Sequence, residues 1–333
     1  MDLAPSQLIS QDGKSFSSLF SEGKLEFFEQ RDREFNWSHE AGAALSVLDV
    51  YSDRIVIGLT TGEIKLFSTV DLRCKQTLSH PKLKSKVTCF HCCTSTGIII
   101  AGYEDASACI WNTHSGDLSL RFCVGNRSVS NGYAMILRMK ETKLVVATAE
   151  NTIRAWSYED SAISFVKEWA TKICVQQLEV AGDLVALKDL SDGIYVYKFD
   201  GTLVHTLHKP DRGGRELVIR GNYVIVGDKC RNLYFWDIST GSHVRTLSSG
   251  AHGSEIIRIN DENSHVMTVD RTGPIVIWSL EEMLANRPAA LIKVFDPSGF
   301  PQPATYCSHY SLGENCFVRL NQNGSAVKVT DFL

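Results

Sequence analysis

Short apolar runs recur along the chain, and seven of them end in an aromatic or β-branched residue. Successive end residues lie 44, 45, 41, 39, 42 and 51 positions apart. All intervals but the last are close to the roughly 40–45 residues of a four-stranded propeller blade. The runs are EIKLF ending at Phe67, SACIW at Trp111, TIRAW at Trp156, GIYVY at Tyr197, NLYFW at Trp236, PIVIW at Trp278 and SAVKV at Val329. The pattern predicts one repeated unit of strands.

Each unit has the same internal order of strands and turns. In the fifth unit, ELVI is followed by Gly221 and Asn222, the strand YVIVG, a polar turn over residues 229–232, and LYFWD. HVRTL, beyond Gly241, supplies an outer strand. Helical periodicity is confined to residues 279–290, where Pro288 limits it to a turn or two. The prediction is therefore an all-β fold.

The two ends of the chain are expected to share one unit. Seven units follow from Ala44, and the last lacks an outer strand because the sequence stops at Leu333. Residues 24–29, KLEFFE, form an isolated strand candidate that can pair with the last unit and remove the exposed edges. We predict a seven-bladed propeller over residues 24–333, closed by this strand, with residues 1–23 as an N-terminal extension.

The repeat resembles the WD40-repeat family, most closely in the second unit. Residues 101–112, AGYEDASACIWN, resemble the family's SGSxDGTIRLWD segment, and His80 occupies the place of its Gly-His histidine. The resemblance implies a hydrogen-bonded blade network of His80, Asp105 and Trp111, in which Tyr103 departs from the usual Ser or Thr. The alternative is an ordinary core tryptophan with His80 on a loop.

Other units keep less of the family motif. The fifth keeps Trp236 but has Cys230 at the turn position, and the sixth keeps Trp278 but has Thr272 there. Phe67, Tyr197 and Val329 replace the tryptophan in the first, fourth and seventh units, so the motif leaves their strand register open. Period and apolar pattern persist through all seven.

Composition places the chain among ordinary globular proteins. Hydrophobic residues make up 44% and charged residues 22%, enough for a large core. The net charge is -4 and no run of Lys and Arg stands out, so nucleic acid is a disfavoured partner. No signal peptide or membrane span is expected, which favours the cytoplasm or nucleus and ten cysteines that stay thiols.

The run from Cys89 to Cys93, CFHCC, is a candidate zinc site with three thiols and an imidazole. Strand alternation places Cys89, His91 and Cys93 on one face and Cys92 on the other, so one ion cannot collect all four. We therefore predict core packing and no metal or other cofactor. No GxSxG, HExxH or phosphate-loop motif is present, and we predict a chain that is not an enzyme, although groups from several blades can converge at a channel.

A basic rim is suggested by similarity to the propellers of F-box/WD substrate receptors. The position just before the turn Asp corresponds to Lys229 and Arg271, and a position near the start of the first strand corresponds to Arg215. Arg258 is a looser match, and Glu104 lies at the same turn position in the second unit. Such cations suit acidic or phosphorylated peptides. The alternative is ordinary solvated charge on loops.

The predicted function is a protein-binding scaffold or adaptor whose loops carry recognition. The F-box/WD resemblance adds a ubiquitin-ligase substrate receptor as a narrower version, although residues 1–23 are too few for an F-box. A component of an RNA–protein or ribosome-associated assembly is the alternative, for which salt-dependent binding would be diagnostic.

Overall fold

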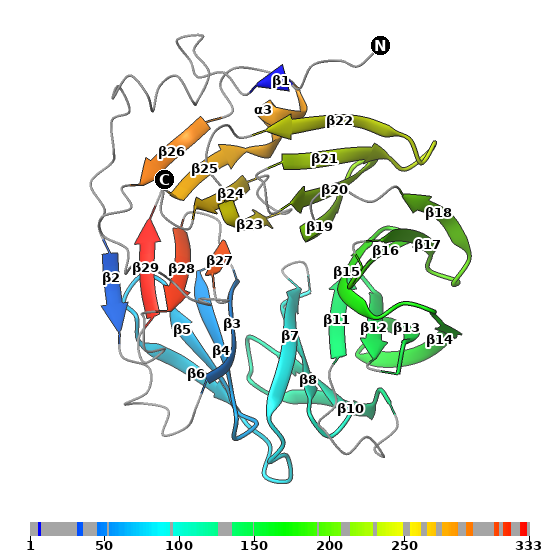
Figure 1. Cartoon of the computed structure of the whole chain (residues 1–333). Helices are drawn as coiled ribbons and strands as arrows, with labels where there is room; N and C mark the ends of the chain where they lie inside the picture. The colour runs from blue at the N-terminus through cyan, green and yellow to red at the C-terminus, as the bar shows by residue number, and fades with distance from the viewer. Residues whose placement is uncertain are drawn as a thin grey trace. The chain divides into compact units, whose positions relative to one another are not determined.

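Strands make up nearly all of the regular structure. The computed structural model describes residues 6–7, 32–35, 45–51, 53–93, 96–125, 135–148, 150–191, 193–207, 214–228, 232–248, 254–260, 265–270, 275–285, 291–295, 310–312, 316–320 and 327–331 (Figure 1). Within these ranges the helix is α3 (Leu280–Leu284), at the place where the sequence predicts a helical turn. The amide of Glu282 donates to the Ser279 hydroxyl at the start of this helix, with a distance of 3.3 Å.

One part of the chain, residues 34–206 and 323–327, contains four complete sheets, and we call it the four-sheet unit. Sheet 1 contains β3 (Leu45–Tyr51), β4 (Arg54–Leu59), β5 (Ile64–Ser68) and β6 (Cys74–Leu78), and sheet 2 contains β7 (Val87–Cys93), β8 (Ile98–Tyr103), β9 (Ser107–Asn112) and β10 (Leu118–Cys123). Sheet 3 contains β11 (Met135–Lys140), β12 (Lys143–Thr148), β13 (Thr152–Glu159) and β14 (Ala162–Ala170), and sheet 4 contains β15 (Val175–Ala181), β16 (Leu184–Asp189), β17 (Ile194–Lys198) and β18 (Leu203–Leu207).

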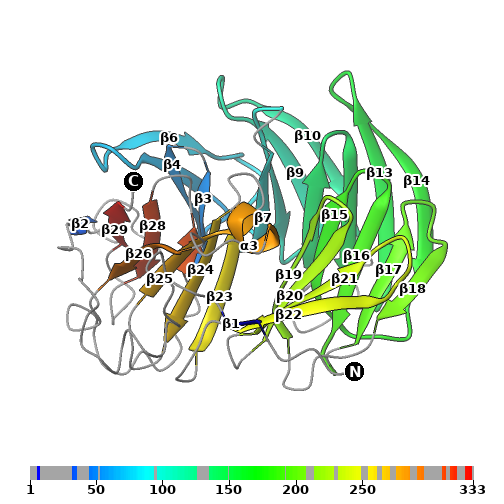
Figure 2. The ribbon, with the colours of Figure 1, turned by 90° about the horizontal axis from the view of Figure 1, so that it is seen from above.

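The remaining residues, 1–33, 207–322 and 328–333, form a second compact part. Sheet 5 contains β19 (Gly214–Arg220), β20 (Tyr223–Asp228), β21 (Asn232–Asp237) and β22 (His243–Ser248), and sheet 6 contains β23 (Ser254–Asn260), β24 (His265–Asp270), β25 (Ile275–Ser279) and β26 (Leu291–Phe295). Sheet 7 contains β27 (Tyr310–Leu312), β28 (Cys316–Leu320) and β29 (Val327–Asp331). The strands just named follow one another in chain order within each sheet, which Figure 2 shows for β23, β24, β25 and β26.

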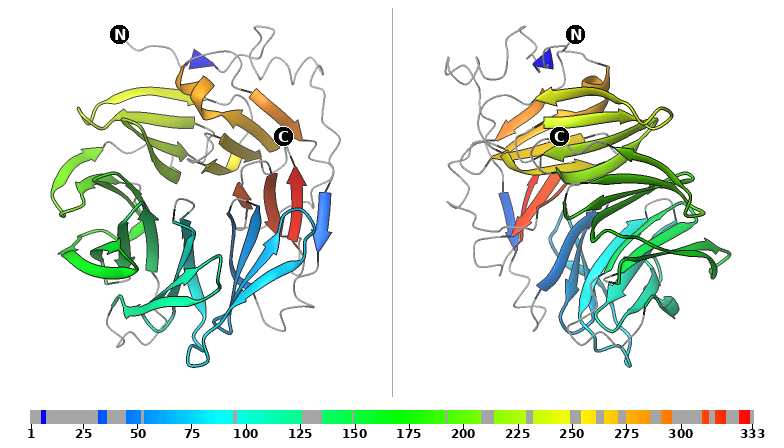
Figure 3. Two further views of the ribbon diagram at one scale, coloured as in Figure 1. Left: turned by 180° about the vertical axis from the view of Figure 1, so that it is seen from behind. Right: turned by 45° about the vertical axis from the view of Figure 1, so that its right-hand side comes forward.

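Strands near the N-terminus extend two of these sheets. β1 (Ser6–Gln7) runs parallel to β22, with Ser6 opposite Leu247 and Gln7 opposite Ser248. β2 (Asp32–Phe35) lies beside β29 at the edge of sheet 7 (Figures 1 and 3). The strand expected to fill this place, residues 24–29, falls outside the described residues. The strand that stands there begins at Asp32, several residues further along the chain.

Neighbouring sheets pack through their first strands and bury apolar side chains between them. In the four-sheet unit β3 contacts β7, β7 contacts β11, and β11 contacts β15; in the other part β19 contacts β23, and β23 contacts β27. Between sheets 2 and 3, Ile100, Ile110, Leu137 and Val146 are fully buried and belong to one apolar cluster. Alternating apolar positions on both sheets supply this core, as the period-two pattern predicts.

Small residues permit this close packing. Gly58 lies on β4 opposite Val47, and a Cβ atom there would come within 2.6 Å of Val47 and 2.8 Å of Val87 on the next sheet. The same register position holds Gly102 in sheet 2 and Ala147 in sheet 3. In sheet 4 it holds Lys188, which is fully buried and donates a hydrogen bond to Gln176.

A β-bulge recurs where the fourth strand passes the aromatic residue of the third. The extra residue is Lys75 opposite Phe67, Ser119 opposite Trp111, Val166 opposite Trp156, Val244 opposite Trp236 and Ile292 opposite Trp278. The strand register of sheet 1, which the sequence motif left open, therefore matches that of sheets 2 and 3. A bulge at one constant place indicates a shared twist, because an extra residue bends the strand locally.

The prediction of an all-β fold with repeated four-stranded antiparallel sheets is confirmed. The number of blades and the closure of the ring remain predictions. No helix in the described part of the chain is long and apolar enough to cross a membrane.

Candidate functional site

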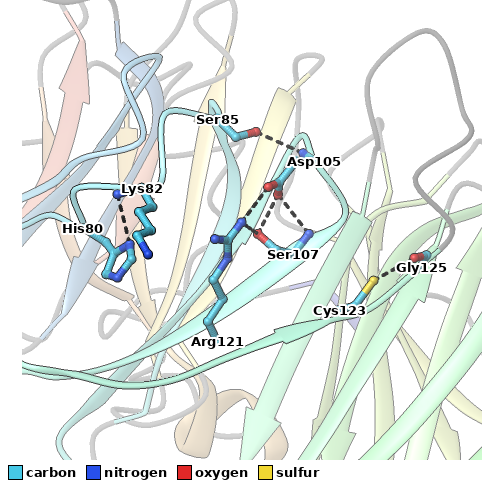
Figure 4. Close-up of polar contacts among 8 residues, drawn as sticks. All are labelled: His80, Lys82, Ser85, Asp105, Ser107, Arg121, Cys123 and Gly125. Atoms are coloured by element: carbon cyan, nitrogen blue, oxygen red, sulfur yellow. Dashed lines mark hydrogen bonds and ion pairs between the residues drawn. The ribbon is translucent and has the colours of Figure 1, made fainter.

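The turn between β8 and β9 holds the densest polar cluster of sheet 2 (Figure 4). One carboxylate oxygen of Asp105 accepts from the Ser107 amide at 3.0 Å and the Ser107 hydroxyl at 2.5 Å. Its other oxygen accepts from Arg121 Nη2 at 2.8 Å, and its own amide donates to the Ser85 hydroxyl at 3.0 Å. Asp105 therefore ties the turn to β9, β10 and the loop before β7.

His80 does not take part in this cluster. Its Nδ1 accepts from the Lys82 amide at 3.3 Å, and no hydrogen bond among the described residues joins it to Asp105 or Trp111. Trp111 is 1% exposed, and neither its buried indole N–H nor the buried hydroxyl of Tyr103 makes a hydrogen bond of good geometry within the described part of the chain. The three side chains that the family resemblance groups together are thus found in three separate environments, with Trp111 in the apolar core.

In two other sheets, an aspartate at a different position accepts hydrogen bonds across the turn between the second and third strands. The sequence analysis did not identify these aspartates. In sheet 4 Asp189, the last residue of β16, accepts from the Gly193 amide at 2.6 Å and the Ser191 hydroxyl at 2.8 Å. In sheet 5 the fully buried Asp228 ends β20 and accepts from the Asn232 amide at 2.7 Å. Both positions correspond to Tyr103, two residues before the motif aspartate. The sequence signal that could have identified both residues is an Asp at the end of the second strand of a unit.

The cysteine-rich run lies on β7, and its side chains divide between two cores. Cys89 and Cys93 pack with the cluster between sheets 2 and 3, whereas Cys92 packs with Phe90 in the cluster between sheets 1 and 2. This confirms the predicted alternation. His91 Nε2 lies 2.8 Å from the carbonyl oxygen of Met139 on β11 and so links sheet 2 to sheet 3. Burial raises the pKa of Cys89 to about 11. The thiol is therefore neutral near pH 7 and a poor metal ligand or nucleophile.

Polar side chains occupy one register position on the first strands of the four-sheet unit, and two contacts that they make link β7 to β11 and β11 to β15. Asp49, His91, Arg138 and Glu179 lie at equivalent positions on the first strands of sheets 1 to 4. Each pairs with the second-strand residue that comes two positions before the one equivalent to Gly58. Arg138 Nε contacts Glu179 Oε1 at 2.8 Å, and both side chains are about a third exposed or less. The sequence analysis did not identify this row, although its members recur at intervals of 42, 47 and 41 residues, close to the repeat period, because they differ in chemical type.

The proposed basic rim falls largely outside the described residues. Lys229 and Arg271 lie in segments that are not described, and Arg215 and Arg258 are placed only by the backbone of β19 and β23. Arg215 is the extra residue of a bulge, because Gly214 pairs with Asp228 and Glu216 with Gly227. The rim therefore stays a prediction. Glu104 is exposed in the β8–β9 turn, as expected.

The residues at the same bulge in sheets 1 and 2 show what this position can do. The Ser46 hydroxyl donates to the Gly58 carbonyl at 2.9 Å, and the Thr88 hydroxyl donates to the Gly102 carbonyl at 3.1 Å. Each short side chain thus bonds back to its own sheet. An arginine at this position has more N–H donors than one such local contact can use. Bulges also often redirect side chains at functional sites.

Exposed apolar side chains gather on fourth strands. Among the described residues, the large hydrophobic side chains that are well exposed are Val70, Phe165, Val166, Leu190, Leu203 and Val244, with exposed fractions from 44% to 75%. Phe165 and Val166 belong to β14, Leu203 to β18 and Val244 to β22, whereas Val70 and Leu190 lie in turns. The sequence analysis placed recognition on loops and did not identify these strand positions.

Comparisons with known proteins agree with the fold and add no function. No family model and no curated protein matches the chain. The crystal structure of the computationally designed Ika8 protein, crystal packing No.1 in P63, resembles it with a TM-score of 0.56 and 17% identity. The match covers 87% of this chain and 96% of the Ika8 chain. At this identity the likeness concerns the fold alone.

Proposed function

We propose that this chain is a non-catalytic protein-binding scaffold. The observation that carries the proposal is the concentration of exposed Phe165, Val166, Leu203 and Val244 on fourth strands. Single exposed apolar residues are common, but four at equivalent outer strands are the kind of side chain that partner proteins bury. The packed sheets beneath them hold these positions rigidly, which lowers the entropic cost of binding.

Affinity capture from a cell extract tests the proposal with a matched pair of variants. The outer-strand variant is Phe165→Ser, Leu203→Ser and Val244→Ser; the turn variant is Val70→Ser and Leu190→Ser, which removes apolar side chains that are more exposed still. We expect specific partners to be lost from the first variant and kept by the second, with unchanged far-ultraviolet circular dichroism. Identical partner sets for all three proteins would refute binding through the outer strands.

A second candidate surface is the basic rim, which we propose as a reader of acidic or phosphorylated peptides. The bulge at Arg215 favours it, because this position is set apart from the regular ladder of β19. Charge reversal of Arg215, Lys229 and Arg271 should abolish capture of partners that phosphatase treatment also releases. Partners insensitive to both treatments would contradict a rim of this kind.

A ubiquitin-ligase substrate receptor is the narrower version of the scaffold and rests on the F-box/WD resemblance. A component of an RNA–protein or ribosome-associated assembly is the alternative function. Capture repeated across salt concentrations separates them, since phosphate contacts make RNA binding fall steeply with added salt, whereas apolar contacts persist.

A further inference from the structure

The hairpin of β13 and β14 is longer than its counterparts. β14 has nine residues, whereas the fourth strands β6, β10, β18, β22 and β26 have five or six. The hairpin closes through Asp160 and Ser161, both with positive φ, as in the tight turns whose twist matches that of paired strands. Figure 2 shows the long green hairpin of β13 and β14. Core packing does not require the added length, because the other sheets form without it.

Exposed apolar side chains lie on this hairpin. Phe165 is 58% exposed and Val166 is 44% exposed. The ring of Phe165 contacts Trp156 edge-on with centroids 6.0 Å apart, and Trp156 contacts Phe122 of sheet 2 at 5.6 Å. Phe165 is therefore held in place by a buried tryptophan while more than half of its surface faces solvent. A fixed aromatic ring of this kind is a good anchor for a partner.

The main chain of β14 offers a second means of binding. β14 is the last strand of sheet 3, and no other described strand pairs with its outer edge. An edge strand carries a row of outward N–H and C=O groups that can accept a further strand. Sheet 5 shows such addition at its own fourth strand, where β1 pairs with Leu247 and Ser248. These residues lie beyond the bulge at Val244 and correspond in register to Trp169 and Ala170 of β14.

Charge on β14 indicates which segment would fit. Glu168 contacts Arg154 Nε at 2.6 Å, whereas the exposed Lys167 makes no direct ion pair within the described residues and interacts with Asp200 only at longer range. A lysine on an edge strand discourages indiscriminate pairing. An acidic residue opposite it would remove that penalty, because oppositely charged cross-strand pairs are favourable.

We propose that the outer edge of β14 binds an extended segment of a partner protein by strand addition, with apolar side chains over Phe165 and Val166 and an acidic residue facing Lys167. This rests on the proposed scaffold function and specifies the surface and the mode of binding. The incoming main chain pairs beyond the bulge, along residues 167–170, as β1 pairs with β22.

A displayed library of random ten-residue peptides provides the probe. Selection on the full chain should enrich peptides with an acidic residue between alternating apolar residues. Phe165→Ser with Val166→Ser should weaken a selected peptide at least tenfold, and Lys167→Glu should shift the selection to basic residues. Val70→Ser, which removes an exposed apolar residue elsewhere, should leave affinity unchanged.

N-methylation of alternate amides in the selected peptide separates strand addition from simple apolar docking. One of the two methylation patterns should abolish binding, because it removes the N–H groups that pair with β14, and the other should be tolerated. Binding that survives both patterns, no enrichment above background, or a chain that dimerises through Phe165 would each overturn the proposal. If capture then depends on Leu203 and Val244 alone, the scaffold function stands and strand addition at β14 falls.

Discussion

At the scale of residues, Asp105 and His80 differ in their contributions although the family motif pairs them. Asp105 satisfies the amide and hydroxyl of Ser107 and contacts Arg121, so its carboxylate replaces several hydrogen bonds to water. His80 is half-buried, and its side chain bonds only to the Lys82 amide within the described residues. The turn is stabilised by local acceptors rather than by a network that crosses the sheet.

We expect Asp105→Ala to lower the free energy of unfolding by about 1–2 kcal/mol, because it leaves Ser107 and Arg121 without their acceptor. His80→Ala should change it by less than about 0.5 kcal/mol. Urea unfolding followed by tryptophan fluorescence measures both. Equal losses for the two variants would place His80 in a network with Asp105 after all.

Buried thiols make stability depend on alkaline pH. Burial raises the pKa of Cys109 to about 12 from its ordinary 9.0, with smaller effects that lower it from Arg121 and raise it from Asp105. Because the folded pKa is above the unfolded one, the stabilisation from the neutral thiol is complete below pH 9 and is lost as pH rises towards 12.

Cys109→Ala should therefore be less stable than the parent at pH 7 and approach or exceed its stability above pH 10. The loss at neutral pH comes from a small cavity, since Cys109 is fully buried. Thermal midpoints at pH 7, 9 and 10.5 measure the crossover. Parallel pH profiles for the two proteins would show that Cys109 titrates at the same pH in both states.

At the scale of elements, the register between strands is set by packing as well as by pattern. The alternation of apolar residues predicted the strands of sheets 1 to 4 and the two faces of β7. The bulges at Lys75, Ser119 and Val166 were not predicted, because the extra residue has no consistent chemical type. What these positions share is their place opposite a large aromatic ring.

Gly58→Ala should lower the free energy of unfolding by about 1–3 kcal/mol, because the new methyl group overlaps Val47 and Val87. The double variant Gly58→Ala with Val47→Ala should recover part of the loss, since it removes one of the two clashing side chains. Chemical denaturation of the three proteins gives the comparison. A single variant as stable as the parent would mean that β3 and β7 can move apart freely.

At the scale of the whole molecule, the chain ends determine how two sheets are completed. β2 beside β29 gives sheet 7 its fourth strand, and β1 gives sheet 5 a fifth. The sequence predicted that a strand near the N-terminus joins the last sheet, but it did not predict which residues form that strand. Residues 24–29 and 32–35 can both form strands, and the local apolar pattern does not choose between them.

Deleting residues 1–31 should leave sheet 7 intact, whereas deleting residues 1–35 removes β2 and exposes the edge of β29. We expect the longer deletion to lower the thermal midpoint by roughly 2–4 °C per kcal/mol of lost pairing and to promote aggregation. Differential scanning calorimetry and light scattering measure both effects. If the shorter deletion already has the full effect, the stabilising strand is β1 or lies within residues 24–29, and β2 does not stabilise the edge of β29.

The amino-acid sequence by itself determined the all-β class, the repeat period, the order of strands within each sheet and the split of the β7 cysteines. These properties depend on side-chain alternation, on turn residues and on their recurrence from one repeat to the next. Only the tertiary structure decided the partners of Asp105, the row from Asp49 to Glu179, the strand added to β22 and the exposure of Phe165. Each of these depends on how side chains pack and pair once the sheets have formed, and the apolar pattern of one repeat does not encode that choice.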